Sequence, residues 1–344
     1  MTQEELQKMI QEAQLLNQKS KMQELLEKAL TQYPDWIWAQ ENMKQLTEYW
    51  KHTYTEYDGN VDPLQHKKIC VFAHYDVHKR IADYVVYWCK SLLEWDCAVI
   101  FVSTCETLSQ GEINKIRPYV SMIIVRPNQG YDFGSYCVGF QKVKQFSHFE
   151  YFMIMNDSCF GPVHNLNKLD AFLSKSEDEV LGNSDFHFGD ALCIQSFFYL
   201  FRYSDKVLDK VEFFLNQFVF TNNIHMIGAK CEVGFNNYLL ACRFYVKLIV
   251  PLKEVELIST FTGMDAYLPF WRISIINFPT PFLKRIVFKK HYGKKEPLLT
   301  SGNGFRNAYW DILTRYNAFF EEKDLLLMDQ INWDLSQIIR KEMF

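Results

Sequence analysis

The sequence predicts an α/β fold in which a mostly parallel β-sheet is flanked by helices. Short apolar runs have the length and composition of strands buried on both faces, and they lie at residues 69–73, 98–102, 122–125 and 151–155. Between the first two runs, one helical face carries Tyr84, Trp88, Leu92 and Trp95. Strand, helix and strand within about thirty residues form a βαβ unit, which makes the neighbouring strands parallel.

Later segments extend this pattern and then leave it. Strand-like segments follow at residues 196–201 and 245–250, and helices are predicted around residues 307–316 and 325–341. We therefore expect an α/β domain over residues 66–260 and a partly helical extension over residues 261–344 that packs on it.

The N-terminal segment, residues 1–55, predicts helices rather than strands. Apolar residues recur at helical spacing in three sets, over residues 6–16, 22–30 and 37–50. Pro34 ends the second helix. A helix pair of this size resembles a tetratricopeptide unit, but fewer than two units are present and about three are needed for a stable array. We expect a helical cap or docking hairpin, joined to the sheet by a linker at residues 57–63.

Composition is that of a globular protein. The 344 residues are 48% hydrophobic and 23% charged, and the net charge of −4 gives no reason to expect nucleic acid as a partner. No apolar run approaches the roughly 20 residues that cross a bilayer, and the acidic start is unlike a signal peptide, so we expect a soluble, cytoplasmic protein. The nine cysteines include no Cys-x-x-Cys pair, which favours free structural thiols over disulfides or a zinc site.

Polar residues follow the predicted strands at their C-terminal ends, where open α/β sheets bind ligands. These strand ends read His74-Tyr75-Asp76, Ser103-Thr104, Arg126 through Gly134, and Asn156-Asp157-Ser158. Because the strands are parallel, the ends should meet at one rim of the sheet. The aromatic and charged residues among them exceed what turns need, so we interpret the rim as a site; ordinary turns are the alternative.

Motifs of several other pocket chemistries are missing from the sequence. Neither Gly-x-Gly-x-x-Gly, a P-loop, Gly-x-Ser-x-Gly nor His-Glu-x-x-His occurs. Four histidines could come together on folding, but their spacing is not that of metal ligands, and we expect each to be hydrogen-bonded or on the surface. They are His74, His164, His187 and His225.

The order of the polar motifs resembles a known family. His-Tyr-Asp stands at residues 74–76, Arg-x-Asn-x-Gly-Tyr-Asp-Phe-Gly at 126–134, and Met-Asn-Asp-Ser-Cys-Phe-Gly-Pro at 155–162. Ile-Gln-Ser-Phe-Phe at 194–198, Cys-Glu-Val-Gly at 231–234 and a Phe-Pro-rich stretch at 278–285 continue the pattern. Over roughly residues 67–290, but not in the N-terminal helices, the sequence resembles the rhamnan synthesis protein F family of bacterial glycosyltransferases. The resemblance implies a GT-A-like nucleotide-sugar fold and sugar transfer during synthesis of a rhamnose-containing surface polysaccharide such as O-antigen.

The resemblance also gives a meaning to Asn156-Asp157-Ser158. In many GT-A enzymes the corresponding strand ends in Asp-x-Asp, whose carboxylates hold a divalent metal against the donor diphosphate. Here one carboxylate remains, and Asp157 could bind Mg²⁺ or Mn²⁺ with the diphosphate completing the shell. Alternatively, Asn156 and Ser158 hydrogen-bond phosphate or sugar while Lys or Arg neutralises the leaving group. We favour weak or no metal dependence.

Transfer with inversion needs a base for the acceptor hydroxyl, and the resemblance suggests Glu232. The segment 231–243 is similar to a helix that carries this base in inverting GT-A enzymes, and we expect Glu232 in its first turn, where the helix dipole favours the ionised form. An ordinary N-terminal helix glutamate is the alternative. Asp157 and Asp190 are further candidates for the base.

Other rim residues are assigned to the donor or the acceptor. The donor-binding candidates are His74, Tyr75, Asp76, Arg126, Asn128, Gly130, Tyr131, Asp132, Asn156 and Ser158. Tyr75 offers a face for the nucleobase, and Asp76 and Asp132 offer acceptors for base or ribose. Arg126 contacts phosphate or braces its loop by pairing with Asp132, and Gly130 and Gly134 allow close approach of a ligand. Gln195 and Ser196 are expected on the acceptor side.

Taken together, the resemblance implies an inverting glycosyltransferase that moves rhamnose or a related deoxyhexose, with dTDP-rhamnose as the expected donor. The expected acceptor is a growing polysaccharide or a lipid-linked oligosaccharide, and other glycan-synthesis proteins are expected partners. The basic stretch 282–295 is expected either to contact the inner membrane face or to be a solvated loop. Two alternatives stay open: a non-catalytic nucleotide-sugar or glycan-binding module, and an interaction protein whose N-terminal helices dock a partner.

Overall fold

The computed structural model describes residues 1–173, 176–177, 179–188, 191–251, 253–255, 269–288, 313, 315–316 and 318–343. The strands are β1 (Thr55–Asp58), β2 (Lys68–His74), β3 (Cys97–Ser103), β4 (Met122–Val125), β5 (Tyr151–Asn156), β6 (Cys159–Phe160), β7 (Glu179–Phe188), β8 (Ala191–Ile194), β9 (Phe198–Arg202), β10 (Tyr245–Val250) and β11 (Leu283–Lys284). The helices are α1 (Gln3–Leu15), α2 (Lys19–Gln32), α3 (Ile37–Lys51), α4 (Asp83–Glu94), α5 (Gln110–Ile116), α6 (Tyr131–Val143), α7 (Asp205–Gln217), α8 (Ile224–Met226), α9 (Gly234–Ala241), α11 (Trp271–Asn277), α14 (Asp324–Ile331) and α15 (Trp333–Met343), with a π-helical segment η4 (Ile227–Val233) between α8 and α9.

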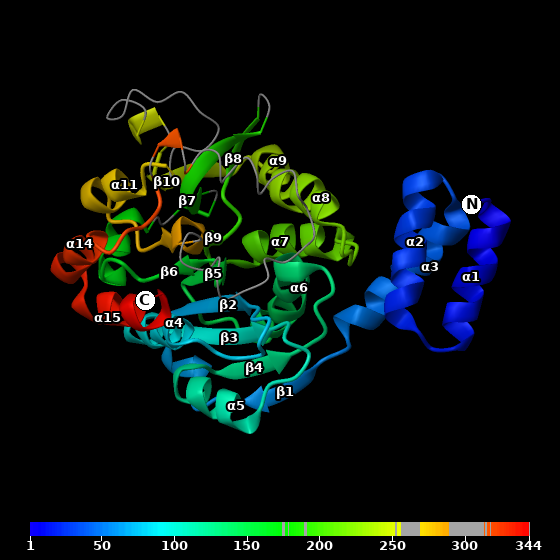
Figure 1. Cartoon of the computed structure of the whole chain (residues 1–344), viewed down its shortest axis with the longest axis horizontal. Helices are drawn as coiled ribbons and strands as arrows, with labels where there is room; N and C mark the ends of the chain where they lie inside the picture. Colours follow the sequence, from blue (N-terminus) through cyan, green and yellow to red (C-terminus); the bar gives the residue numbers. More distant parts are fainter. Residues whose placement is uncertain are drawn as a thin grey trace.

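A mixed sheet forms the centre of the molecule (Figure 1). Among the described residues it has nine strands in the order β1-β4-β3-β2-β5-β9-β7-β10, with β8 paired to β7. The adjacent strands β4, β3, β2 and β5 run parallel, as do β10 and β7, while β1, β9 and β8 join antiparallel. The short strands β11 and β6 form a second, antiparallel pair. The predicted α/β fold with a largely parallel sheet is confirmed.

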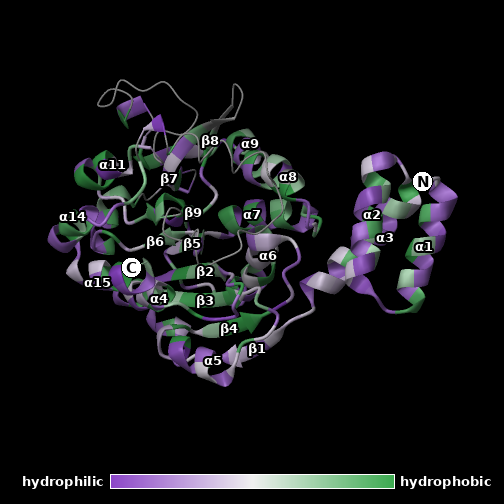
Figure 2. Cartoon of the chain, in the orientation of Figure 1, coloured by the Kyte–Doolittle hydropathy of each residue, from purple (hydrophilic) through white to green (hydrophobic). Residues whose placement is uncertain are grey.

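Alternation along the central strands sends successive side chains into two different cores. On β2, Cys70 and Phe72 join the core that contains α4 and α15, whereas Ile69 and Val71 join the core that contains α6. Figure 2 accordingly shows β2 and β3 as hydrophobic strands between covering helices. Because both faces are covered, the strands are apolar at every position, which is why they read as continuous runs in the sequence.

The six predicted strands lie within two residues of their observed bounds, and one prediction needs correction. The expected linker at 57–63 is wrong in its first part, because β1 pairs with β4 as an edge strand. The last residues of the third predicted strand end, 131–134, are already part of α6, where no helix was predicted from the sequence. A Cβ on Gly134 would lie 2.4 Å from the Gln129 carbonyl oxygen, so this helix needs glycine for close packing.

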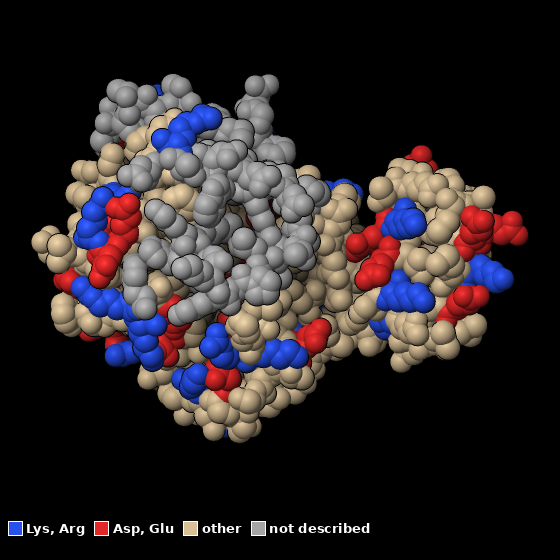
Figure 3. All heavy atoms as spheres, viewed as in Figure 1, with Lys and Arg blue, Asp and Glu red and all other residues tan. Residues whose placement is uncertain are grey.

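The N-terminal helices stand beside the sheet as a group of three (Figure 1). Their bounds follow the three predicted apolar sets. The expected hairpin corresponds to α1 and α2, and α3 adds a third helix to it. They contact the segment after α7: the Gln23 side-chain amide donates to the Phe220 carbonyl at 3.3 Å, and the Phe220 N–H donates to the Thr47 hydroxyl at 3.3 Å. On the face drawn in Figure 3, acidic and basic side chains are interspersed over these helices.

The C-terminal helix α15 packs against α4, and α14 packs against α15. The Asn332 side chain, at the break between them, donates to the Pro162 carbonyl at 2.8 Å, and the Glu342 carboxylate accepts from the Asp83 N–H at 3.1 Å. The predicted helical region 325–341 is therefore confirmed, with a break at Asn332, while most of the predicted helix 307–316 lies outside the described residues. No helix in the described part of the chain has the length and hydrophobicity of a membrane span.

Replacing Gly139 with alanine should destabilise the fold by about 1–3 kcal/mol, because overpacking forces a shift in a dense core. A Cβ at this position of α6 would lie 2.4 Å from a methyl group of Val71 and 3.1 Å from one of Val102. At Gly111 of α5 the nearest such atom is the Ser109 hydroxyl at 3.6 Å, so Gly111→Ala serves as the matched control and should change stability by no more than about 1 kcal/mol. Urea unfolding of both variants measures the difference, and equal midpoints would show that α6 does not pack as described.

Candidate active site

The ends of the parallel strands meet at one rim of the sheet. His74 ends β2 and Ser103 ends β3, and the His74 Nδ1 lies 3.0 Å from the Ser103 hydroxyl. The Tyr75 N–H donates to the Asp157 carboxylate at 3.3 Å. These direct contacts place the first, second and fourth predicted strand ends side by side.

The tripeptide Asn156-Asp157-Ser158 is held by several hydrogen bonds. The Asn156 side-chain amide donates to the Asp132 carboxylate at 2.7 Å, and its oxygen accepts from the Ser158 N–H at 3.1 Å. The Tyr84 hydroxyl reaches the Asp157 carbonyl at 3.2 Å and the Asp157 carboxylate at 3.5 Å. The tripeptide thus connects three elements, through Tyr75 after β2, Tyr84 in α4 and Asp132 in α6, which a simple turn would not do.

The donor atoms around Asp157 do not fit a divalent metal site of the Asp-x-Asp kind. One oxygen of its carboxylate already accepts from Tyr75 and Tyr84, and the Arg285 guanidinium lies 4.0 Å from the same oxygen. Asn156 and Ser158 carry no charge, whereas Mg²⁺ and Mn²⁺ prefer one or two carboxylates together with phosphate oxygens and water. Within the described residues, no group of three His, Cys, Asp or Glu side chains is arranged to hold a metal ion.

Arg126 braces its own loop from inside the protein. Its guanidinium donates to the Gln129 carbonyl and, at 3.3 Å, to the Ser135 hydroxyl, and the side chain is only 1% exposed. It also lies over the Phe220 ring at 5.1 Å. Burial lowers the pKa of Arg126 to about 10. Of the two predicted roles this arrangement favours bracing, with Gln129 and Ser135 as partners in place of Asp132.

The rest of the loop before α6 is shaped by close packing. Gly130 has φ +77°, and a Cβ there would lie 2.9 Å from the Phe218 ring, so its glycine is needed against protein atoms rather than for a ligand. The Tyr131 hydroxyl donates to the Asn222 carbonyl at 3.2 Å. The Asn128 side-chain oxygen is buried and accepts no hydrogen bond from the described residues.

The loop after β2 is organised by Asp76. Its carboxylate accepts from the N–H groups of His78 at 2.8 Å and Arg80 at 3.1 Å, as short acidic side chains do in turns. One of its oxygens is therefore used within the loop. The neighbouring Tyr75 is half-buried and contributes part of its ring to the surface of the rim.

Electrostatics at the rim are dominated by carboxylates. Burial, with the nearby charges of Asp157 and Glu232, raises the pKa of Asp132 to about 7, against the opposing effects of Asn156 and Lys284. Burial also lowers the pKa of His74, although Asp157 and Asp76 oppose the shift. Asp132 is thus a carboxyl that changes charge near neutral pH.

Glu232 lies at the same rim but not at a helix start. The helix begins at Ile224 and continues through η4 into α9, so Glu232 is well inside it and the predicted first-turn position is wrong. The expectation failed because η4 has no sequence signal that separates it from a new helix start. The N-terminal dipole therefore does not act on Glu232. Instead it lies in a π-helical segment, a feature that occurs frequently at functional sites.

The Glu232 carboxylate is hydrogen-bonded to Ser196, one of the two residues predicted on the acceptor side. The Ser196 hydroxyl donates to its Oε1 at 2.6 Å, and the Tyr136 hydroxyl donates to the Ser196 carbonyl at 3.4 Å. Gln195 is buried, and its N–H donates to the Ser184 carbonyl at 3.0 Å. Asp190, the other candidate for the base, lies outside the described residues.

Sequence reasoning missed two cations at this rim, Lys284 and Arg285. Lys284 ends β11, which pairs with β6 directly after the tripeptide, and the Arg285 N–H donates to the Ser158 carbonyl at 3.0 Å. The signal was present in the basic stretch 282–295, which we interpreted as a membrane contact or a solvated loop. Its first two cations lie against the rim instead, and residues 289–295 lie outside the described part of the chain.

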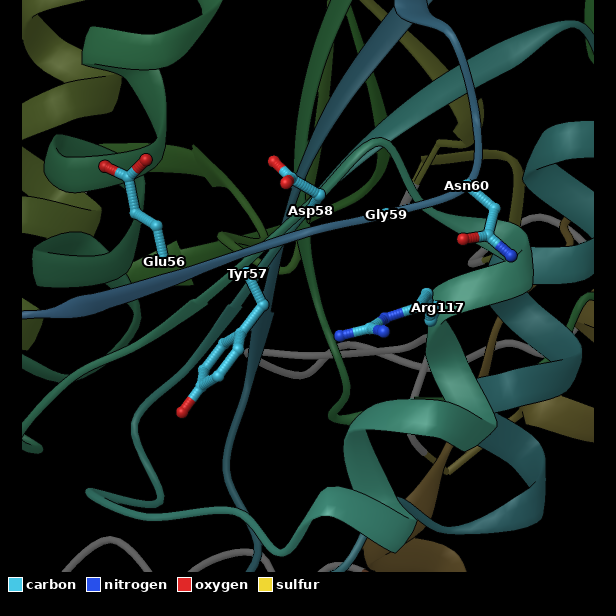
Figure 4. A pocket seen from close by; sticks show the side chains of 6 residues that line it. All are labelled: Glu56, Tyr57, Asp58, Gly59, Asn60 and Arg117. Atoms are coloured by element: carbon cyan, nitrogen blue, oxygen red, sulfur yellow. The ribbon is translucent and has the colours of Figure 1, made fainter.

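Two cavities lie away from this rim. Figure 4 shows a polar pocket of about 360 Å³ lined by Glu56, Tyr57, Asp58, Gly59, Asn60 and Arg117. Because Asp58 pairs with Met122 at the start of β4, this pocket lies at the amino end of the parallel strands, opposite the rim. A groove of about 740 Å³ separates α2 and α3 from residues 214–231 and reaches Lys230, two residues before Glu232.

The chain matches a family and several known proteins. A model of the family described as rhamnan synthesis protein F matches residues 99–301, more than half of the chain, which confirms the resemblance drawn from the motifs. The uncharacterized protein y4gN of Sinorhizobium fredii is 31% identical over 128 residues, which are 36% of this chain and 33% of that protein. The match thus spans about a third of the relative's length. Two crystal structures of the glycosyltransferase GlyE of Streptococcus pneumoniae are also similar. The first matches 80% of this chain and 65% of its own, at 12% identity and a TM-score of 0.33. The second, the apo form, matches 81% of this chain and 64% of its own, at 11% identity and a TM-score of 0.36.

The raised pKa of Asp132 predicts a distinct pH dependence of stability. A carboxyl with a folded pKa of about 7 and an unfolded pKa of about 3.9 stays protonated up to a higher pH in the folded state than in the unfolded state. Stability should therefore fall as the pH rises from about 4 to about 7, and level off above. Asp132→Asn should remove this fall, so that its melting temperature relative to wild type increases by several degrees between pH 5 and pH 8.

Thermal unfolding over this pH range measures the effect. Asp58→Asn, which changes an exposed carboxylate at the opposite edge of the sheet, is the matched control. Parallel pH profiles for wild type and Asp132→Asn would contradict the electrostatic description of the rim.

Proposed function

The chain belongs to the rhamnan synthesis protein F family, and on this premise we propose that it is a glycosyltransferase. The donor proposed is a nucleotide-diphosphate deoxyhexose, with dTDP-rhamnose as the first candidate, and the acceptor is a growing polysaccharide or a lipid-linked oligosaccharide. The observation that carries the proposal is the rim itself, where Asn156 links Asp132 to the tripeptide and the Asp157 carboxylate lies 4.0 Å from the Arg285 guanidinium. Carboxylates and cations grouped at the carboxyl edge of a parallel sheet are typical of a nucleotide site.

The donor is proposed to lie across the ends of β2 and β5. Tyr75 presents a partly exposed ring on which a nucleobase can stack. Asp132, which accepts from the Asn156 amide, is positioned to accept from a ribose or sugar hydroxyl. Ser158 and Asn156 then face the diphosphate or the sugar as neutral hydrogen-bonding groups.

The reaction proposed is a displacement with inversion at the anomeric carbon. The acceptor oxygen forms the new bond to that carbon as the bond to the diphosphate breaks, and the acceptor proton passes to a carboxylate. Glu232 is the proposed base: Ser196 occupies its Oε1 and orients the group, which leaves Oε2 to take the proton. Ser196 therefore acts as a positioning residue on the acceptor side.

Glu232→Gln should lower turnover by about 100-fold or more and leave donor binding within a few-fold of wild type, because general-base catalysis contributes roughly 10²–10⁴ in rate. Release of nucleoside diphosphate from dTDP-, UDP- and GDP-sugars, with a rhamnosylated acceptor glycan, measures turnover, and isothermal titration with the same donors measures binding. Glu24→Gln, at an exposed position of α2, is the matched control. Full turnover by Glu232→Gln would remove Glu232 from the mechanism, and donor binding without turnover by the wild type would favour a binding module instead.

A further inference from the structure

We propose that Lys284 and Arg285 neutralise the diphosphate of the donor, the task that a divalent cation performs in glycosyltransferases with Asp-x-Asp. The inference rests on the proposed function and names the phosphate-binding groups of that site. Three observations support it: the backbone pairing that holds the two cations, the groups around each of them, and the lack of suitable metal ligands in Asn156-Asp157-Ser158.

The backbone fixes both cations beside the tripeptide. In the antiparallel pair of β11 and β6, Lys284 lies opposite Cys159 and Leu283 lies opposite Phe160. The Arg285 N–H continues this pairing by donating to the Ser158 carbonyl at 3.0 Å. A segment more than a hundred residues away in the sequence is thus held in register with the end of β5. Phe282 and Leu283, both buried, anchor it in the core.

Lys284 is a half-buried cation held by an aromatic ring. Its Nζ lies 3.9 Å from the centre of the Phe197 ring, which stabilises the charge without neutralising it. Among the described residues no carboxylate lies within ion-pair distance of this ammonium. Its charge nevertheless acts on the Asp132 carboxyl, so it lies close to the proposed donor site.

Arg285 holds its guanidinium at the surface of the same site. The group lies 4.9 Å from the centre of the Tyr84 ring and 4.0 Å from the Asp157 carboxylate, and its side chain is 27% exposed. The guanidinium also donates to the Asp157 carbonyl at 3.5 Å, so its N–H donors are held beside the tripeptide. Guanidinium matches phosphate geometry in a bidentate manner.

The charge balance favours this arrangement over a metal at the tripeptide. A divalent cation at Asp157 would have one carboxylate, already hydrogen-bonded to Tyr75 and Tyr84, and would lie beside the positive charge of Arg285. The leaving diphosphate gains negative charge as the sugar departs, and two preformed cations can stabilise that charge in a site shielded from water. Lys284 and Arg285 together supply the positive charge that one divalent ion would bring.

Nucleoside diphosphate binding in the presence of EDTA tests the proposal. Isothermal titration of the whole chain with dTDP, UDP and GDP should show binding of at least one of them, with the same affinity in EDTA as in Mg²⁺ or Mn²⁺. Lys284→Met, which keeps the stem over Phe197, and Arg285→Gln should each weaken that binding by about tenfold or more and reduce its dependence on salt. Arg285→Lys should recover part of the loss, and Lys21→Met, at an exposed position of α2, should have no effect.

The outcomes separate this inference from the function on which it rests. Wild-type binding that requires Mg²⁺ or Mn²⁺, or wild-type affinity in both Lys284→Met and Arg285→Gln, would overturn the role of the cations and leave a glycosyltransferase in place. Absence of binding to all three diphosphates and their sugars under every condition would contradict the proposed function and this inference together. Thermal unfolding of each variant shows whether a loss of binding comes from loss of fold, and Arg285→Lys provides a second, conservative test of the same position.

Discussion

Parallel pairing of β2 with its two neighbours is the constraint on which the rim depends. His74 lies opposite Ser103 of β3, and Ala73 lies opposite Asn156 of β5. This register brings the loops that follow these strands to one edge at hydrogen-bonding distance, as the Tyr75 and Asp157 contact shows. A shift of one residue would exchange the two faces of each strand and would send apolar side chains of both cores to the wrong side. The same burial that makes the strands stable therefore fixes the positions of the polar groups at their ends.

A concentration of negative charge at the rim must be balanced by other parts of the chain. Burial and the nearby charges of Asp157 and Glu232 raise the pKa of Asp132, so the positive charge at the rim does not fully offset its carboxylates. Hydrogen bonds from Asn156 and Ser196 hold two of these carboxylates in place without adding charge. Positive charge beside the tripeptide comes from Lys284, which ends β11, and from Arg285, which follows it late in the sequence. A phosphate group bound at the cations, with Asp132 protonated, is consistent with such a balance.

Local sequence patterns predicted the parts of the fold that depend on the spacing of apolar residues along the chain. Apolar runs gave the parallel strands, and the helical spacing of Tyr84, Trp88, Leu92 and Trp95 gave α4. The rim residues followed from the same step, because parallel strands end at one edge. The patterns failed where long-range contacts decide the structure. Gly134, expected to let a ligand approach closely, is needed instead for close packing against Arg126, and Gly139 is needed against Val71. The place of Lys284 depends on pairing with Cys159, which no local spacing encodes.

The segment at residues 218–222 connects the N-terminal helices with the loop that precedes α6. On one side, Phe220 and Asn222 are held by Thr47 and by the Glu27 carboxylate, which accepts from the Asn222 N–H at 2.8 Å. On the other side, the Phe220 ring lies against Arg126, and the Asn222 carbonyl accepts from Tyr131. The helices are therefore more than an independent docking module, because they support the residues on which the loop before α6 packs.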